Sequence, residues 1–224
     1  MMQIKLVSSI LEANDRLAST NRELFQAKGV FVLNLMSSPG SGKTTILERS
    51  IEHLQGKLNI GVIEGDISTA RDAERIAEKG IPVVQINTSG ACHLDANMIA
   101  ACLDDFNLDE LDLLVVENVG NLVCPAEFDV GEDMKVMVLS VTEGNDKPLK
   151  YPLMFRESKA LLVNKIDLLP YTNFDLDTLE RDVLGINSGI KIFPVSAIKD
   201  EGMEAWCQWL TFSRPLSFGL IVSN

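Results

Sequence analysis

Residues 37–44, Ser-Ser-Pro-Gly-Ser-Gly-Lys-Thr, combine two glycines with a lysine and a threonine at a spacing suited to binding phosphate. Glycine lets backbone N–H groups approach phosphate oxygens closely, the lysine neutralises the β- and γ-phosphates, and the threonine hydroxyl binds Mg²⁺. The segment departs from the pattern G-x-x-x-x-G-K-[ST] at its first position, which is Ser37. The phosphate-binding residues predicted in this way are Gly40, Ser41, Gly42, Lys43 and Thr44.

A second polar segment, Asn-Lys-Ile-Asp at residues 164–167, directly follows the apolar run 160–163. An aspartate at the carboxyl end of a strand points into the crevice where open α/β sheets bind ligands. Its two oxygens can accept hydrogen bonds from N1–H and the 2-amino group of guanine, whereas adenine has no donor at either position. A Ser-Ala pair follows the later apolar run 192–195, where GTPases hold guanine O6 with backbone N–H groups. The order of the motifs predicts a guanine site formed by Asn164, Lys165, Asp167, Ser196 and Ala197.

Acidic residues end two other predicted strands, at Asp66 and at Glu117. Mg²⁺ prefers carboxylate oxygens and keeps much of its hydration shell, so we expect both residues near a magnesium ion that Thr44 also binds. Gly120 follows three residues later and is placed to offer its N–H to the γ-phosphate. Two roles stay open for Asp72: it either orients the attacking water or is a solvated residue in the first turn of a helix.

A different kind of metal site is indicated by Cys92, His93 and Cys124. Thiolate and imidazole ligands suit Ni²⁺, Zn²⁺ or Cu²⁺, not Mg²⁺. The alternative for the two cysteines is packing of small residues, because no C-x-x-C or H-x₃₋₅-H spacing is present. Cys102 and Cys207 lie in helical apolar patterns and are expected to be packing residues.

Neighbouring residues of a regular helix or strand point in different directions, so Cys92 and His93 can share an ion only in irregular backbone. Gly90, directly before this segment, allows the backbone to turn sharply there. Three ligands leave a tetrahedral or square-planar ion incomplete, which favours a dimer with metal at its interface. Cys124 lies four residues after Gly120, within about 14 Å of extended chain, so GTP and metal binding are expected to influence each other.

Apolar runs and helical patterns alternate from residue 30 onward. We expect strands at 30–36, 60–63, 82–86, 113–116, 135–142, 160–163 and 190–195, and helices at 8–28, 44–54, 69–79, 91–102, 178–184 and 203–210. Near-continuous apolar strands separated by helices predict a mostly parallel sheet with helices on both faces, as in P-loop NTPases. The N-terminal helix has an uneven apolar stripe that includes Leu11, Leu17, Leu24 and Phe25.

The chain has 224 residues, 46% of them hydrophobic, and a net charge of −12. This length favours a single domain over 1–224 with a core at about 30–210. The negative charge argues against nucleic acid or anionic lipid as the main partner. No run of 18 apolar residues and no signal peptide is seen, so we expect a cytoplasmic protein. The tail 213–224 indicates no function.

Six segments together resemble the HypB family of hydrogenase nickel-incorporation GTPases. They are residues 36–45, 64–66, 90–96, 117–125, 141–144 and 164–167. The resemblance implies slow GTP hydrolysis, GTP-dependent homodimerisation, and delivery of nickel to the large subunit of nickel–iron hydrogenase with a small zinc-binding partner. It implies Cys92, His93 and Cys124 as ligands of Ni²⁺ or Zn²⁺, and Lys150 as a contact to the partner subunit's guanine. It also implies Thr45 in the nucleotide site, and catalytic roles for Lys43, Gly120 and Asp72, the last near Mg²⁺ and water.

Some members of that family carry an N-terminal Cys-x-x-Cys-Gly-Cys motif or a histidine-rich tract, and neither is present in these residues. We therefore expect the predicted interface site, not N-terminal nickel storage. Two other functions compete with the GTP-gated nickel carrier. One is a nickel- or zinc-buffering scaffold in which hydrolysis is incidental, and the other is a small-molecule kinase that shares the phosphate-binding loop.

Overall fold

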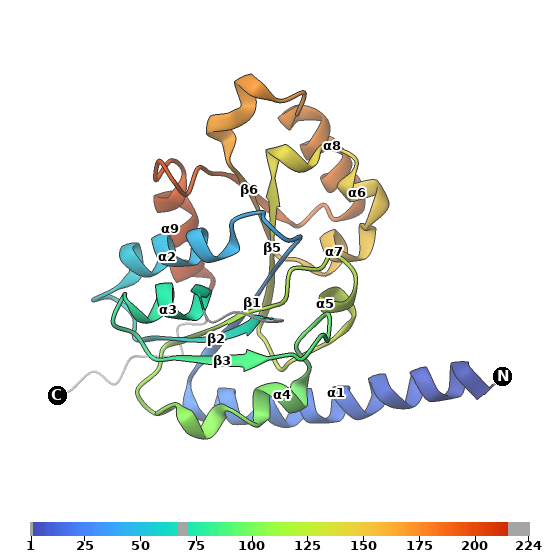
Figure 1. Ribbon diagram of the computed structural model, residues 1–224, viewed down its shortest axis with the longest axis vertical. Coiled ribbons are helices and arrows are strands. Elements are labelled where there is room, and N and C mark those ends of the chain that lie inside the picture. The colour runs from blue at the N-terminus through green and yellow to red at the C-terminus, as the bar shows by residue number, and fades with distance from the viewer. Residues whose placement is uncertain (1, 67–70, 215–224) are drawn as a thin grey trace.

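A parallel β-sheet forms the centre of the molecule (Figure 1). The computed structural model describes residues 2–66 and 71–214, with side chains from residue 11 onward, and within that part the sheet has seven strands in the order β3-β2-β4-β1-β5-β6-β7. The strands are β1 Phe31–Ser37, β2 Ile60–Asp66, β3 Val83–Asn87, β4 Leu113–Glu117, β5 Met134–Ser140, β6 Ala160–Asn164 and β7 Lys191–Pro194. The predicted α/β class and parallel sheet are confirmed.

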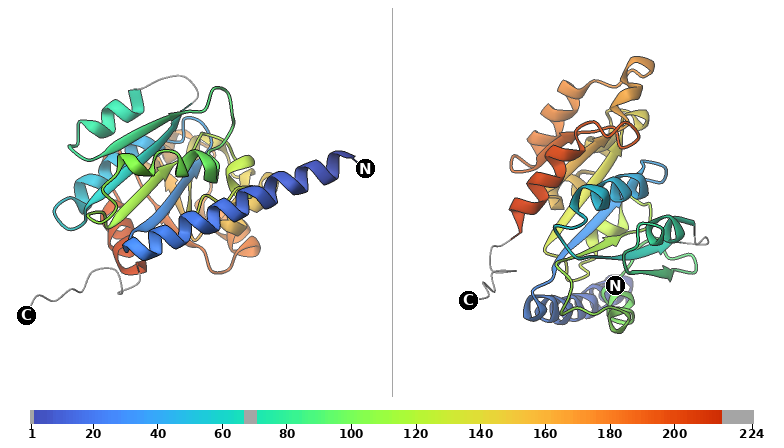
Figure 2. Two further views of the ribbon diagram at one scale, coloured as in Figure 1. Left: turned by 90° about the horizontal axis from the view of Figure 1, so that it is seen from below. Right: turned by 90° about the vertical axis from the view of Figure 1, so that its left-hand side faces the viewer.

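Helices cover both faces of this sheet (Figures 1 and 2). The helices described are α1 Met2–Lys28, α2 Lys43–Leu54, α3 Arg71–Ala77, α4 Ala96–Ala100, α5 Cys124–Glu127, α6 Lys147–Lys150, α7 Pro152–Glu157, α8 Leu176–Ile186 and α9 Met203–Ser213, with 3₁₀ turns η1 Leu103–Asp105, η2 Val141–Glu143 and η3 Ile166–Tyr171. Apolar residues of α2, α3 and α9 pack on one face. Those of α1, α4, α5, α7 and α8 pack on the other.

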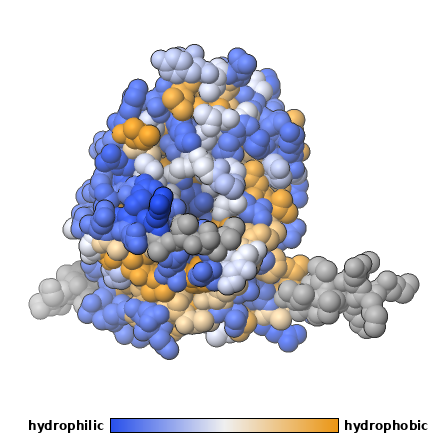
Figure 3. Space-filling view, in the orientation of Figure 1, coloured by the Kyte–Doolittle hydropathy of each residue, from blue (hydrophilic) through white to orange (hydrophobic). Residues whose placement is uncertain are grey.

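The middle strands are apolar almost without interruption because side chains on both their faces are buried. Every residue of β1, β4 and β6 is buried, which matches the expectation for a parallel sheet between two helical layers. The edge strand β3 is only half-buried, and apolar residues reach the surface around it in the space-filling view (Figure 3).

The buried face of α1 differs from the predicted stripe. Leu17 and Leu24 are exposed, at 39% and 37%, whereas the buried positions include Asn14 and Asn21. Both asparagines donate hydrogen bonds to backbone carbonyls, which removes the cost of burying them. The N-terminal half of α1 extends beyond the body of the molecule (Figure 2).

Several element boundaries also differ from the sequence prediction. The prediction of a helix at 91–102 was wrong for its first half, because α4 begins only at Ala96. The Asp95 side chain caps this helix by accepting a hydrogen bond from Met98 N–H. The strand expected to reach residue 142 ends at Ser140, which starts a capped 3₁₀ turn with Glu143. The short helices α5, α6 and α7 were not predicted. Residues 69–70 of one expected helix and 215–224 of the tail lie outside the described residues.

Candidate functional site

The glycine-rich loop connects the carboxyl end of β1 to the first turn of α2. Gly40 and Gly42 have φ angles of 75° and 96°, which glycine adopts without strain. A Cβ atom at Gly42 would lie 2.5 Å from Nδ2 of Asn164, so no other residue fits there without displacing that side chain. The loop therefore has the shape that its sequence predicts.

Ser37, the departure from the usual pattern, has a specific contact in the structure. Its buried hydroxyl lies 3.0 Å from Nζ of Lys43, which donates a hydrogen bond to it. The next residue, Ser38, donates to a carboxylate oxygen of Glu143. Serine at position 37 thus helps to orient the lysine that the loop presents.

The predicted base-recognition residues meet the glycine-rich loop. Asn164 donates to the Ser41 carbonyl at 2.9 Å and accepts from Ala197 N–H at 3.2 Å, so it joins the two loops. Lys165 Nζ donates to the carbonyl of Gly40 at 2.7 Å. These contacts come from strands far apart in the sequence, and they assemble the phosphate and base motifs into one site.

Asp167 lies at the outer end of this arrangement. The hydroxyl of Ser196 donates to Oδ1 of Asp167 at 2.7 Å, which holds the carboxylate beside the loop after β7. Lys150, the residue that the resemblance assigns to a partner subunit, is 60% exposed and pairs with Asp146 at 2.5 Å. It does not line the pocket around the glycine-rich loop.

Four acidic side chains, Glu64, Asp66, Asp72 and Glu117, line the pocket around the glycine-rich loop. We call this pocket the nucleotide pocket and define it by its lining residues, which are Pro39, Gly40, Ser41, Gly42, Lys43, Thr44, Thr45, Glu64, Gly65, Asp66, Asp72, Arg75, Glu117, Asn118, Val119 and Gly120. Thr44 donates to Oε1 of Glu117 at 2.8 Å. Glu64 lies opposite Glu117 in the register of β2 and β4. One oxygen of each glutamate, Oε2, is buried and has no hydrogen-bond partner among the described residues.

Burial raises the pKa of both glutamates. Burial, followed by the nearby charge of Glu117, raises the pKa of Glu64 to about 8. Burial also raises the pKa of Glu117, although Lys43 and Thr44 act against it. Unpaired buried carboxylate oxygens next to a threonine hydroxyl are the donor set that Mg²⁺ prefers, so this site fits the predicted ion. From the sequence, Asp66 and not Glu64 was assigned to Mg²⁺, although Glu64 lies only two residues earlier on β2.

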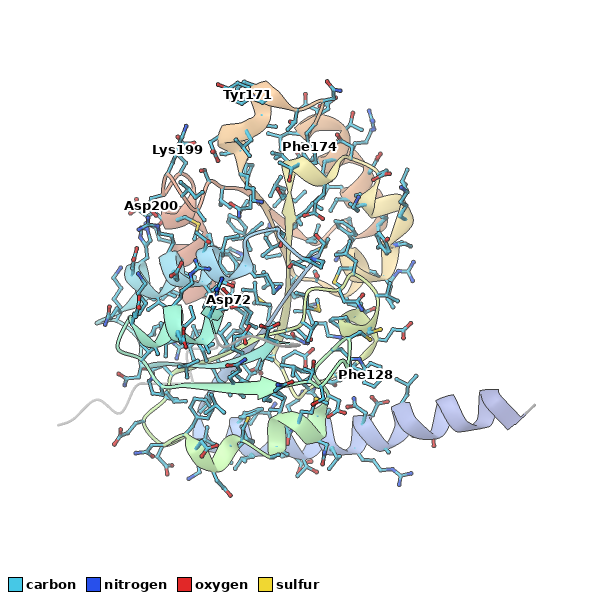
Figure 4. All side chains as sticks on the ribbon, viewed as in Figure 1. Asp72, Phe128, Tyr171, Phe174, Lys199 and Asp200 are labelled. Carbon is cyan, nitrogen blue, oxygen red and sulfur yellow. The ribbon has the colours of Figure 1, made fainter. Side chains whose placement is uncertain are left out.

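Asp72 lies in the first turn of α3 and faces the pocket, as Figure 4 illustrates. It accepts from Arg75 at 3.1 Å, and Arg75 also contacts Glu48 at 2.5 Å and Thr45 at 3.2 Å. Asp72 is therefore in the first turn of a helix and also lines the pocket, and its role in orienting water stays a prediction. Arg75 was missed because nothing in the local sequence shows that α3 packs next to α2.

The second predicted site is a cluster of Cys92, His93 and Cys124. One ligand atom from each residue lies within 4.8 Å of the other two, and each residue is half-buried. The Cys92 and Cys124 sulfur atoms are 2.9 Å apart, and Cys92 Sγ is 3.6 Å from Nδ1 of His93. Cys102 and Cys207 are buried among apolar residues, as expected for packing.

Irregular backbone makes this convergence possible. Gly90 has a φ of 96°, and residues 91–95 form no regular element before α4. The ring of Phe128 lies against the ring of His93, with 3.8 Å between the two centroids. Burial lowers the pKa of His93, so its imidazole is neutral at pH 7 and able to bind metal. Burial and the contact with Cys92 raise the pKa of Cys124 to about 11, so its proton must leave when a metal binds.

Gly120 connects the two sites. A Cβ atom at Gly120 would lie 3.0 Å from the Cα and N atoms of Pro39, so this segment packs directly against the glycine-rich loop. Cys124 begins α5 four residues later. The residues that carry the cysteine ligand are therefore in contact with the phosphate-binding segment.

A sequence-family profile described as "CobW/HypB/UreG, nucleotide-binding domain" matches residues 31–194 of the chain. The hydrogenase maturation factor HypB of Escherichia coli (strain K12) is 50% identical over 214 residues, covering 96% of this chain and 73% of that protein. This chain belongs to the HypB family of hydrogenase maturation factors.

Solved HypB structures have the same fold as this chain. The crystal structure of HypB from Helicobacter pylori in complex with nickel has a TM-score of 0.86 at 38% identity, covering 95% of this chain and all of that one. HypB from Archaeoglobus fulgidus also has a TM-score of 0.86, at 39% identity, covering 92% of this chain and 100% of that one. In the part of the chain that the structure describes, no helix is long and apolar enough to cross a membrane.

Proposed function

We propose that this HypB-family chain is a GTP-hydrolysing metallochaperone that binds nickel at Cys92, His93 and Cys124 and releases it during maturation of nickel–iron hydrogenase. The observation that carries the proposal is the convergence of these three ligand atoms within 4.8 Å, on loops that contact the nucleotide pocket. A metal site that served only as a buffer would not need to share its backbone with a phosphate-binding segment.

GTP is the proposed nucleotide. Asp167 accepts from the N1–H and 2-amino groups of guanine. The Ser196-Ala197 segment is the proposed site of O6, where the Ala197 N–H, which donates to Asn164 Oδ1 in the structure, would turn to the base. Gly40, Ser41, Gly42 and Thr45 surround the phosphates, and Asn164 and Lys165 hold the base loop against them. Selectivity for guanine follows because adenine would leave the Asp167 carboxylate facing an acceptor.

Hydrolysis of GTP to GDP and phosphate is the proposed reaction, with water attacking the γ-phosphorus. Lys43 neutralises charge on the β- and γ-phosphates, Gly120 N–H donates to a γ-phosphate oxygen, and Asp72 orients the water. Thr44, Asp66 and Glu117 would hold Mg²⁺, which supplies positive charge to the phosphates when bound. Slow turnover suits a switch, since the GTP state then lasts long enough to act.

The metal site favours a homodimer. Three ligands from one chain leave a square-planar Ni²⁺ or tetrahedral Zn²⁺ one short, and a second copy can donate or share a thiolate. Lys150 is exposed and free of the nucleotide pocket of its own chain, as a contact to the partner's guanine requires. We further propose a cytoplasmic protein with one domain over 1–224, which acts with a small zinc-binding protein and the hydrogenase large subunit.

A single-turnover experiment separates the nickel carrier from the buffering scaffold. The nickel-loaded chain is mixed with GTP or with a non-hydrolysable analogue, and nickel transfer to a chromogenic chelator is followed together with phosphate release. The carrier transfers nickel in step with phosphate and retains it with the analogue. Equal nickel transfer in both mixtures would favour the scaffold. A separate measurement addresses the kinase: if Asp167→Ala binds GTP as tightly as the unaltered chain does, the kinase is favoured.

A further inference from the structure

The Cys-His loop, residues 88–96, is attached to the nucleotide pocket at two points. At its start, Thr88 N–H donates to the carbonyl of Asp66 at 3.0 Å, at the carboxyl end of β2. Just after the two metal ligands, Leu94 N–H donates to Oδ1 of Asn118 at 3.0 Å, directly after β4. Both acceptors belong to residues that line the nucleotide pocket.

A third attachment point lies on α1, outside the nucleotide pocket. Ala96 N–H donates to Oδ1 of Asn14 at 3.0 Å, and its carbonyl accepts from Nδ2 of Asn21 at 2.9 Å. The helix is itself fixed to the segment before β5, because Arg22 pairs with Asp129 at 2.6 Å. The end of the Cys-His loop is therefore held by a helix whose described side chains do not line the nucleotide pocket.

Asn118 is the buried centre of these contacts, at 1% exposure. Its Oδ1 accepts from both Leu94 N–H and Val119 N–H, the latter at 2.9 Å. Its Nδ2 donates to Oδ1 of Asn34 on β1 at 3.1 Å. A side-chain amide offers this combination of acceptor and donor without charge and on two separate atoms. The residue lies between the predicted magnesium ligand Glu117 and the predicted γ-phosphate glycine Gly120 and is joined to both through the backbone.

Packing reinforces the hydrogen bond to Leu94. This side chain is fully buried, and a Cβ atom at Gly65 would lie 2.8 Å from its Cγ and Cδ1 atoms. Leu94 is thus pressed against β2 while its N–H is bonded to the residue after β4. A shift of either strand end changes the position of Leu94, because close-packed interiors transmit displacements.

We infer that Asn118 is a positioning residue that sets the Cys92–His93 half of the metal site according to the bound nucleotide. When the γ-phosphate draws residues 117–120 toward it, Asn118 displaces Leu94 while α1 holds Ala96 in place. The two residues before Leu94 then turn relative to Cys124, which follows on the same moving segment. Both halves of the metal site respond to one displacement. This inference rests on the proposed function.

The test measures linkage between nickel and nucleotide in the full chain. Nickel dissociation constants are determined with Mg²⁺ and either GDP or a non-hydrolysable GTP analogue, and their ratio is compared among variants. Coupling between sites amounts to about 5- to 150-fold in affinity, so the unaltered chain should show a ratio in that range. Asn118→Ala should reduce the ratio to within about 2-fold of one, because Leu94 is no longer held to the pocket.

Asn187→Ala is the matched control. That asparagine also bonds several backbone groups, donating to the carbonyls of Phe155 and Ser158 and accepting from Gly189 N–H. These groups lie before β6 and before β7, at the opposite strand ends from the base-recognition residues, and none belongs to the Cys-His loop. Its loss lowers stability without touching the Cys-His loop, so the ratio should stay that of the unaltered chain. A merely structural role for Asn118 would weaken nickel binding equally in both nucleotide states and leave the ratio unchanged.

Each outcome decides a different point. An unchanged ratio in Asn118→Ala overturns the inference and leaves the proposed function intact, whereas a ratio of one in the unaltered chain refutes the nucleotide-gated carrier itself. If Asn118→Ala does not fold, amide hydrogen exchange of the unaltered chain provides the test. The Leu94 amide should exchange at different rates with GDP and with the GTP analogue, and equal rates would overturn the inference.

Discussion

Replacing Glu64 with glutamine is expected to stabilise the protein at neutral pH when no divalent cation is present. The Glu64 side chain is 3% exposed, its Oε2 has no hydrogen-bond partner among the described residues, and it lies opposite Glu117. Ionisation in this place costs free energy that glutamine, which has nearly the same shape, does not incur.

The sign and size of the effect follow from the pKa. Burial raises the pKa of Glu64 from 4.5 to about 8 in the folded chain. Stability from this group is therefore fully present below about pH 4.5 and is lost as the pH rises toward 8. Each rise of one pH unit between these values lowers the free energy of unfolding by about 1.4 kcal/mol. A rise from pH 5.5 to 7.5 therefore lowers it by at most about 2.7 kcal/mol. Water in the open nucleotide pocket screens the charge, and we expect about 1–2 kcal/mol.

Urea unfolding followed by tryptophan fluorescence, with a chelator and without nucleotide, measures this difference. As the pH rises from 5.5 to 7.5, the free energy of unfolding of Glu64→Gln should increase by about 1–2 kcal/mol relative to that of the unaltered chain. For the exposed-site control Glu110→Gln, the same difference should change by less than about 0.5 kcal/mol. Adding GDP and Mg²⁺ should narrow the difference, since a cation offsets the buried charge. A gain that does not grow with pH would refute the reasoning.

Four further substitutions test the two sites. Cys92→Ala and Cys124→Ala should each abolish stoichiometric Ni²⁺ binding in calorimetric titration while GTP binding survives, with Cys102→Ala as the control that binds normally. Asp167→Ala should weaken GTP binding by about 10- to 150-fold, because hydrogen bonds to charged groups contribute about 1.5–3 kcal/mol. If the unaltered chain binds GTP and ATP analogues with equal affinity, this role of Asp167 is contradicted. Gly120→Ala should weaken binding of a GTP analogue by about 10-fold more than binding of GDP, because the added methyl group collides with the glycine-rich loop. Displacement of a fluorescent nucleotide measures both affinities. Equal losses for the two nucleotides would argue against contact between Gly120 and the γ-phosphate.

The phosphate loop was predictable from the sequence because its chemistry lies within eight consecutive residues, 37–44. The same holds for strands such as β4 and β6, whose apolar runs mark burial on both faces. The Cys-His loop was harder, since Ala91–Cys102 has helix-forming composition. Its first half is non-helical: Leu94 N–H bonds to the distant Asn118, and the Asp95 side chain caps a helix that begins at Ala96.

The sequence by itself determined the fold class, the nucleotide-binding motifs and which residue types could bind a soft metal, because each depends on residue identity and short spacing. Only the tertiary structure placed Glu64 against Glu117, Arg75 against Thr45, and Asn118 beneath the Cys-His loop. Hydrogen bonds and register between strands that are far apart in the chain depend on how the sheet is ordered, and local patterns do not encode that order.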